Sequence, residues 1–197
     1  MQQELLNQAM SIFDTSEKWN AFLELSNQRN FIQEAFLSKA KDPILKYFNS
    51  HPIEGWVCEP WGNHKYDFKW YLRDFGKNSL CLVLGWGFQF ILFLDDSNSY
   101  DAEKINYLLQ TPEYSKVLMS FDRIDRQFEE KFKVVEKKNY KFDSPFDSNF
   151  EDAQLAWYVG NMTEKFVEQI IRKVERFRSN EEITRLLYRL NEESKRS

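Results

Sequence analysis

The sequence is poor in the residues that mark disulfide-rich, loop-rich or disordered proteins. It has 2 cysteines, 6 glycines and 5 prolines among 197 residues. Two cysteines cannot build a disulfide scaffold, and 42% hydrophobic residues are too many for a disordered chain. A chain of this length can remove roughly 70% of its unfolded surface from water. We therefore expect a single domain over residues 1–192 and a frayed tail over residues 193–197.

The sequence also lacks a basic excess and a long apolar run. Its 27 basic and 31 acidic residues give a net charge of −4, so no global positive field attracts nucleic acid or an anionic membrane. The N-terminus lacks the basic start and apolar core of a signal peptide, and no stretch reaches 18 uninterrupted apolar residues. We expect an acidic, soluble, cytoplasmic protein with no membrane segment, for which nucleic acid is not the favoured partner.

The motifs of common catalytic sites are missing as well. There is no Gly-x-Gly-x-x-Gly and no Walker-type loop, which removes the simplest warrants for nucleotide binding. His51 and His64 are the only histidines, and neither Cys58 nor any serine lies in a recognisable nucleophile motif. So few histidines and cysteines also argue against a structural zinc site. We expect no resident cofactor and a non-enzymatic role rather than a catalytic one.

What the sequence does contain is an aromatic-rich stretch, residues 65–96, with the pattern of three strands joined by short glycine-containing turns. Apolar side chains at 66, 68, 70 and 72 alternate with more polar ones, which predicts a strand with two unlike faces. Residues 80–84 and 88–94 are largely apolar on both faces, as in strands that are covered on both sides. Residues 55–59 could add a short edge strand.

Helices are predicted on either side of this meander. Helical spacing of apolar residues predicts a first helix over residues 1–13 and a second that begins at a capping pair, Asp14 and Glu17. A third helix should begin near Asn30 and end before Asp42 and Pro43, followed by a helical turn at 44–48. After the meander we expect helices capped by Ser99, Thr163 and Ser179. Between the first and second of these, a long amphipathic helix should run from Pro112 to about Lys138. Residues 139–152 are interpreted as an ordered loop, and 154–159 as a strand or a helical turn.

This order of elements indicates an α+β domain. Its centre would be an antiparallel, three- to four-stranded meander at about residues 56–95, flanked by N-terminal and C-terminal helices. We expect at least one helical layer on each apolar face of the sheet.

One pair of residues in the first predicted strand is a candidate for catalysis. Asp67 and Lys69 project from the same face, where the carboxylate could hold Mg²⁺ and the ammonium could stabilise charge on a phosphate. The spacing resembles the Asp/Glu-x-Lys element of the PD-(D/E)xK nuclease superfamily, over three residues. The resemblance implies a Mg²⁺-dependent phosphodiesterase or nuclease, with Glu59 or Glu54 as a preceding metal ligand and Glu34 as a helix-borne acid. The alternative is a salt bridge on an edge strand.

A second acidic pair, Asp95 and Asp96, follows the third predicted strand. Carboxylates at the end of a strand can bind metal, but the same residues form polar turns and helix entries. No other acidic pair lies at an obvious spacing, so we predict a turn.

Aromatic residues outside the meander are the other candidates. Tryptophan at an exposed turn is a common anchor of protein interfaces; it can also stack on a nucleic-acid base or simply cover the end of a sheet. The candidate binding residues are Trp56, Trp61, Trp86, Trp157 and Tyr158. The only local basic cluster, residues 131–141, is explained by a solvated helix face.

Our leading hypothesis is therefore a non-enzymatic protein-binding or accessory module that uses exposed aromatics and an acidic surface to bind a protein partner. Two alternatives stay open. One is the Mg²⁺-dependent nuclease with Asp67 and Lys69, and the other is single-stranded nucleic-acid binding through the aromatic strand.

Overall fold

A computed structural model describes residues 2–62, 67–85, 89–121, 124–128, 132–136 and 152–196. The N-terminal helices are α1 (Gln2–Ile12), α2 (Ser16–Asn27), α3 (Arg29–Ser38) and α4 (Lys41–Ser50). The strands are β1 (Trp56–Pro60), β2 (Phe68–Leu72), β3 (Leu80–Gly85), β4 (Gln89–Leu94), β5 (Ile124–Phe128) and β6 (Phe132–Glu136). The remaining helices are α5 (Ala102–Leu109), α6 (Ser115–Met119), α7 (Asp152–Asn161), α8 (Thr163–Arg178) and α9 (Glu181–Ser194).

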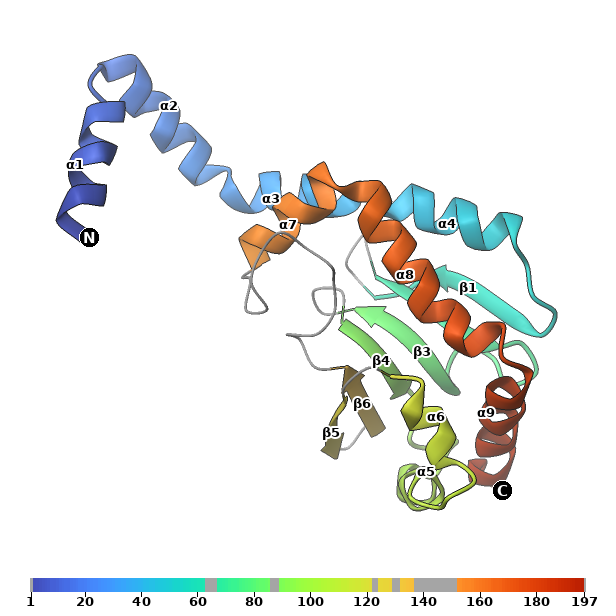
Figure 1. Cartoon of the computed structure of the whole chain (residues 1–197). Helices are drawn as coiled ribbons and strands as arrows, with labels where there is room; N and C mark the ends of the chain where they lie inside the picture. Colours follow the sequence, from blue (N-terminus) through green and yellow to red (C-terminus); the bar gives the residue numbers. More distant parts are fainter. Residues whose placement is uncertain are drawn as a thin grey trace.

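The predicted meander is confirmed, and with it the α+β class. Strands β1 to β4 pair in chain order and are antiparallel throughout, with Cys58 opposite Trp70 and Leu82 opposite Leu92. Figure 1 shows helices from both ends of the chain beside this sheet. Antiparallel neighbours joined by short turns follow directly from the alternating and apolar runs in the sequence.

The two faces of the sheet are covered differently. One face, which includes Phe68, Trp70 and Leu82, packs in a large core with the apolar stripes of α4, α5, α8 and α9. The other face forms a small cluster of strand residues, partly covered by Trp61 and Tyr71. The small cluster consists of Cys81, Val83, Ile91 and Phe93. Within the described ranges no helical residue joins it, so the predicted helical layer on that face is wrong for this part of the chain.

The long helix predicted from Pro112 to about Lys138 is also wrong. Helix α6 ends at Met119, and residues 124–128 and 132–136 form the antiparallel pair β5–β6. Strand β6 adds to the open edge of β4, which places Ile91 opposite Val135. The sheet then has six strands in the order β1-β2-β3-β4-β6-β5. An open strand edge offers a row of backbone donors and acceptors, and pairing with it outweighs a helical spacing of side chains.

The predicted helices are otherwise present, although their first residues are shifted. The side chains of Thr15, Asp101 and Asn180 accept the capping hydrogen bonds of α2, α5 and α9, one or two residues away from the predicted caps. Pro43 lies inside the first turn of α4, where its missing N–H is not needed. Residues 154–159, left open between strand and helix, belong to α7.

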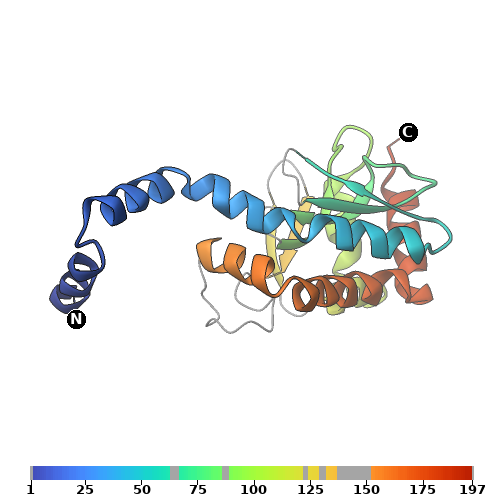
Figure 2. The ribbon, with the colours of Figure 1, turned by 90° about the horizontal axis from the view of Figure 1, so that it is seen from above.

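The two ends of the chain differ in how they meet this core. Figures 1 and 2 show α1 and α2 projecting away from the rest of the molecule, while α3 lies beside α7. At the other end, the first two residues of the predicted frayed tail, Glu193 and Ser194, belong to α9. Ser194 is buried, and the N–H of Arg196 donates to the carbonyl of Ser99 at 2.9 Å.

Candidate functional site

Asp67 and Lys69 both lie in the interior of the fold. Only 3% of Asp67 and 2% of Lys69 is exposed. The Lys69 ammonium donates to the carbonyl of Lys77 at 2.9 Å and to Oδ2 of Asp95 at 3.2 Å. Its nitrogen also lies 5.4 Å from the centre of the Trp61 ring. The ammonium is thus already surrounded by protein groups. A salt bridge is present, as the alternative predicted, but it is not on an edge strand, because β2 lies between β1 and β3 and Lys69 is buried.

Trp61 covers the same face of the sheet. Its ring centre lies 5.5 Å from that of Phe93, in an edge-to-face arrangement. Gly85 lies beneath it, and a Cβ added to this glycine would sit 2.7 Å from Cζ3 of the tryptophan. Trp61 therefore closes the small cluster on the second face together with the aliphatic stem of Lys69, and its ring is only partly exposed.

The carboxylates considered for a metal do not gather into one site. Glu59 lies directly opposite Lys69 and accepts a hydrogen bond from the Tyr71 hydroxyl at 3.3 Å. Glu54 and Glu34 are exposed, outside the sheet. A search of the described residues found no group of three or more histidine, cysteine, aspartate or glutamate side chains that could hold a metal ion. Within that part of the chain, Asp67 and Glu59 are not joined by a third metal-ligating side chain.

Asp95 and Asp96 have separate structural roles. Asp95 pairs with Lys69, as described above. Asp96 accepts hydrogen bonds from the Ser99 hydroxyl at 2.7 Å and from the N–H of Asn98 at 2.9 Å, and these bonds lower its carboxyl pKa. The predicted polar turn is confirmed.

The surroundings of the two cysteines do not favour a reactive thiolate. Burial raises the pKa of Cys58 to about 12, although the nearby charge of Arg178 acts in the opposite direction. Burial likewise raises the pKa of Cys81 to about 12, and its thiol donates to the carbonyl of Phe93. His51 stacks on the ring of Tyr47 at an exposed helix end. Since a thiolate is the reactive form, neither cysteine is suited to nucleophilic chemistry near pH 7. His64 lies outside the described residues.

The buried thiol of Cys81 predicts a measurable dependence of stability on pH. A thiol in an unfolded chain has a pKa of about 8.5, so the unfolded state loses its proton first as the pH rises. The stability contributed by the protonated thiol is complete below about pH 8.5 and is lost between about pH 8.5 and about pH 12. In urea titrations, we expect the free energy of unfolding to fall more steeply from about pH 9 to about pH 10.5 in the wild type than in Cys81→Ala.

Tyr100 and Tyr114 also lower the stability of the fold as the pH rises, because burial raises the pKa of both hydroxyls. They are present in both proteins, so the comparison of slopes isolates Cys81. Equal slopes would contradict the inferred protonation of the Cys81 thiol.

The five aromatic candidates have different fates. Trp56 is buried, and its indole N–H donates to the hydroxyl of Thr184 at 3.3 Å. Tyr158 is completely buried, and its hydroxyl accepts a hydrogen bond from the Gln169 amide at 2.6 Å. Both rings are therefore core residues whose polar atoms are satisfied inside the fold, and neither is an exposed aromatic. Trp86 lies outside the described residues.

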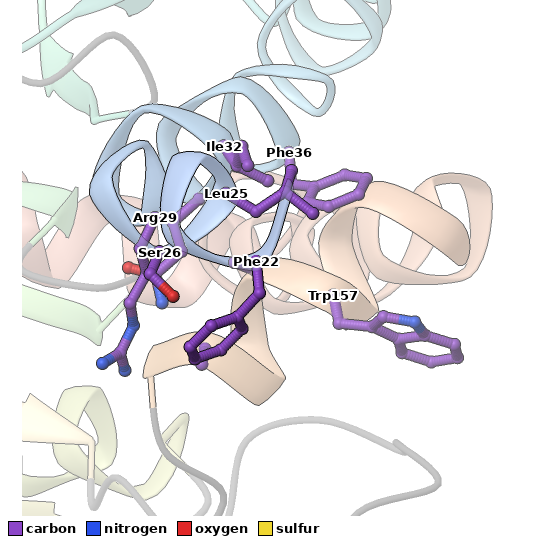
Figure 3. A pocket seen from close by; sticks show the side chains of 10 residues that line it. Phe22, Leu25, Ser26, Arg29, Ile32, Phe36 and Trp157 are labelled. Atoms are coloured by element: carbon purple, nitrogen blue, oxygen red, sulfur yellow. The ribbon is translucent and has the colours of Figure 1, made fainter. Parts of the chain in front are cut away.

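Trp157 is exposed to 45% and lines a groove that the sequence did not indicate. We call it the α2–α7 groove; its volume is about 410 Å³, and it lies among α2, α3 and α7. Figure 3 shows its side chains, with Phe22 and Trp157 standing apart on different helices. The groove is lined by Phe22, Leu25, Ser26, Arg29, Ile32, Gln33, Phe36, Ala153, Ala156 and Trp157. Arg29 is the only charged residue of this set.

A close contact between α3 and α7 lies next to the groove, because Phe36 takes part in both. Gly160 is buried, and a Cβ added there would sit 2.1 Å from Cδ1 and 2.9 Å from Cβ of Phe36. The missing side chain of Gly160 thus lets the two helices approach, as small residues do at close helix crossings. Lys39 reinforces the contact, since its ammonium donates to the carbonyl of Gly160 at 3.1 Å.

The apolar surface continues from the groove along the N-terminal arm, by which we mean residues 2–27 of α1 and α2. The ring of Phe22 lines the groove and also lies 4.6 Å from the ring of Phe13 and 5.5 Å from that of Trp19. Helix α2 has no buried residue. Its apolar stripe therefore faces solvent instead of a core.

Helical spacing of Trp19, Phe22 and Leu23 predicts the inner face of a helix, but in the structure each of these side chains is more than a third exposed. The apolar residues of α8 are spaced more regularly than those of α2, and in α8 Phe166, Ile170 and Val174 are buried. An amphipathic stripe nevertheless does not state which surface will cover it.

Among the described helices, none is both long enough and apolar enough to cross a membrane. Comparisons with protein-family models, with curated proteins and with solved structures found no match.

Proposed function

We propose that the chain is a non-enzymatic protein-binding module whose contact surface is the α2–α7 groove with the adjoining apolar side of the N-terminal arm. The observation that carries this proposal is the groove itself, about 410 Å³ in volume and lined by apolar side chains of three helices. Aromatic and aliphatic side chains around a hollow are the usual anchors of helix-in-groove recognition.

The exposure of this surface supports the proposal. Leu25 is 60% exposed, and Trp19 and Trp157 are each nearly half exposed. Single exposed apolar residues are ordinary, but these join into one surface through Phe22, which belongs to both the groove and the aromatic cluster of the arm. Contiguous apolar patches of this kind mark interaction sites on soluble domains.

The proposal keeps one residue of the sequence-based set and moves the rest of the site. Trp157 remains a candidate contact, while Trp56 and Tyr158 are core residues. Trp61 contacts Phe93 and Lys69, so its ring packs within the fold. The binding surface would be helical and would lie away from the sheet.

The two alternatives have weaker support. A nuclease role for Lys69 would need the ammonium to leave Asp95 and the carbonyl of Lys77 in order to meet a phosphate. Single-stranded nucleic acid would have to bind a chain with a net charge of −4, through an aromatic strand whose Phe68 and Trp70 are fully buried.

Photo-cross-linking tests the proposed surface. A photo-reactive amino acid replaces Ser26, which lines the groove, or Phe31, which is 73% exposed in α3 and does not line the groove. In extract of cells that express the chain, we expect a protein adduct from position 26 and much less from position 31. Leu25→Glu, in a residue that is 60% exposed, should remove the adduct and change the free energy of unfolding by less than about 0.5 kcal/mol. Equal adducts from both positions, or none from position 26, would contradict the proposed surface.

A further inference from the structure

We propose that the partner at this surface is a second copy of the same chain, so that the arm of each copy packs against the α2–α7 groove of the other. This inference rests on the proposed function, because it names the occupant of the same surface. It follows from the isolation of the arm, the area left exposed, the geometry of the surface and its charge.

The two helices of the arm need a partner surface to be stable. Helix α1 has 11 residues and α2 has 12, and isolated helices of about 12–15 residues are marginal in water. Most helical stability in proteins comes from burying an apolar face, yet α2 buries no residue in a single chain. A second surface that covers this face would supply the missing stabilisation.

The groove and the arm share one side of the helical segment α2–α3. Trp19, Phe22, Ser26, Arg29, Gln33 and Phe36 recur every three or four residues, which places them on a common face. Phe31, in α3, is 73% exposed and does not line the groove. Phe31 therefore serves as a control position for substitutions in the groove.

The exposed apolar area has the size of a dimer interface. Among the residues whose burial is described, the large apolar side chains exposed on the arm and α7 are Met10, Ile12, Trp19, Phe22, Leu23, Leu25 and Trp157, each between 37% and 68% exposed. Together they amount to roughly three and a half complete large side chains, or about 700 Å² at about 200 Å² each. Two copies would bury about 1,400 Å², within the range of about 1,200–2,000 Å² for specific interfaces.

The surface is also suited to meeting itself. It presents both a projecting part, the aromatic cluster of Phe13, Trp19 and Phe22, and a hollow, the groove beside that cluster. A twofold axis brings the projection of each copy to the hollow of the other, and twofold dimers are the commonest oligomers. Arg29 is the only charged side chain in the groove, as expected for the apolar core of a homodimer interface.

Charge argues against a lipid surface as the occupant. Amphipathic helices that lie on membranes carry lysine and arginine on their polar face. The charged residues of the arm are Glu4, Asp14, Glu17, Lys18 and Glu24, so its net charge is negative. A protein surface is therefore the better complement.

Sedimentation of the full chain tests this inference. Over about 1–200 µM, we expect a concentration-dependent rise toward twice the 23.8 kDa mass of the chain. Leu25→Glu places a charge in the interface twice, once in each copy, and should weaken association by more than about 100-fold. Trp157→Glu, on a different helix, should do the same, whereas Phe31→Glu should leave the dissociation constant within about twofold. Circular dichroism and urea titration confirm that each variant is folded.

Several results would overturn the inference. A chain that stays monomeric throughout, a dimer that survives both Leu25→Glu and Trp157→Glu, or a dimer weakened equally by Phe31→Glu would each do so. The cross-linking experiment distinguishes this failure from failure of the proposed function. A monomeric chain with an adduct of another mass at position 26 overturns self-association alone, and a chain with neither dimer nor adduct overturns both.

Discussion

Asn191→Ala is expected to lower the free energy of unfolding by about 4 kcal/mol, the largest effect that we predict for a single polar side chain here. Asn191 is completely buried in α9. Its Oδ1 accepts from the N–H of Leu80 at 2.8 Å, and its Nδ2 donates to the carbonyl of Leu80 at 3.2 Å. Alanine would leave both backbone groups buried without a partner, and each such group costs about 1–3 kcal/mol.

The reason lies in the pairing of β3. The register between β2 and β3 extends from Phe68 opposite Leu84 to Trp70 opposite Leu82, and Leu80 lies beyond it. The Asn191 amide takes the place of the next strand residue and also donates to the carbonyl of Leu187 in its own helix, at 3.0 Å. One side chain thus satisfies the end of the strand and fixes α9 against the sheet.

Urea unfolding of matched variants measures this effect. Asn191→Asp can still accept from Leu80 but cannot donate, so it should also be strongly destabilised. Asn49→Ala, at an exposed position in α4, should change the free energy of unfolding by less than about 0.5 kcal/mol. A loss below about 1 kcal/mol in Asn191→Ala would show that the amide does not complete the strand.

Lys69→Met is expected to lower the free energy of unfolding by about 2 kcal/mol. Methionine keeps much of the apolar stem but removes the charge that contacts Asp95 and the carbonyl of Lys77. Breaking a fully buried ion pair costs about 3–5 kcal/mol. The side chain of Asp95 is 32% exposed and can be hydrated, so the smaller value applies.

The same variant separates the structural role of Lys69 from the nuclease alternative. Lys77→Met is the matched control, because Lys77 is exposed and its carbonyl, not its side chain, contacts Lys69. We expect the control to be as stable as the wild type. A Lys69→Met protein of unchanged stability that had lost a Mg²⁺-dependent phosphodiesterase activity would instead favour the nuclease.

The meander could be predicted because its signal is local. Alternation around Phe68 and Trp70 and the apolar run around Leu82 require only that neighbouring side chains point to opposite faces. The opposite holds for residues 124–136, where helical spacing predicted one helix and the structure has β5 and β6. There the deciding partner was the edge of β4, more than 30 residues earlier in the chain.

The candidate site was less predictable than the fold. Asp67 and Lys69 are on one face, as their spacing requires, but the carbonyl of Lys77 and the carboxylate of Asp95 decide what the lysine contacts. Trp56 and Tyr158 looked like possible anchors in sequence. In the structure both rings are in the core, where Trp56 is hydrogen-bonded to Thr184 in α9 and Tyr158 to Gln169 in α8. Composition does not show which aromatic ring remains outside.

The sequence by itself determined the α+β class, the four-stranded meander and the amphipathic character of the helices, because these depend on spacing within a few residues. Tertiary structure alone decided which apolar stripes are covered. Phe166 in α8 and Leu25 in α2 are both apolar residues of surface helices, but the first packs in the core against the sheet and the second is largely exposed and lines the α2–α7 groove. The difference arises because burial is a relation between two surfaces, and only the folded chain fixes which surfaces meet.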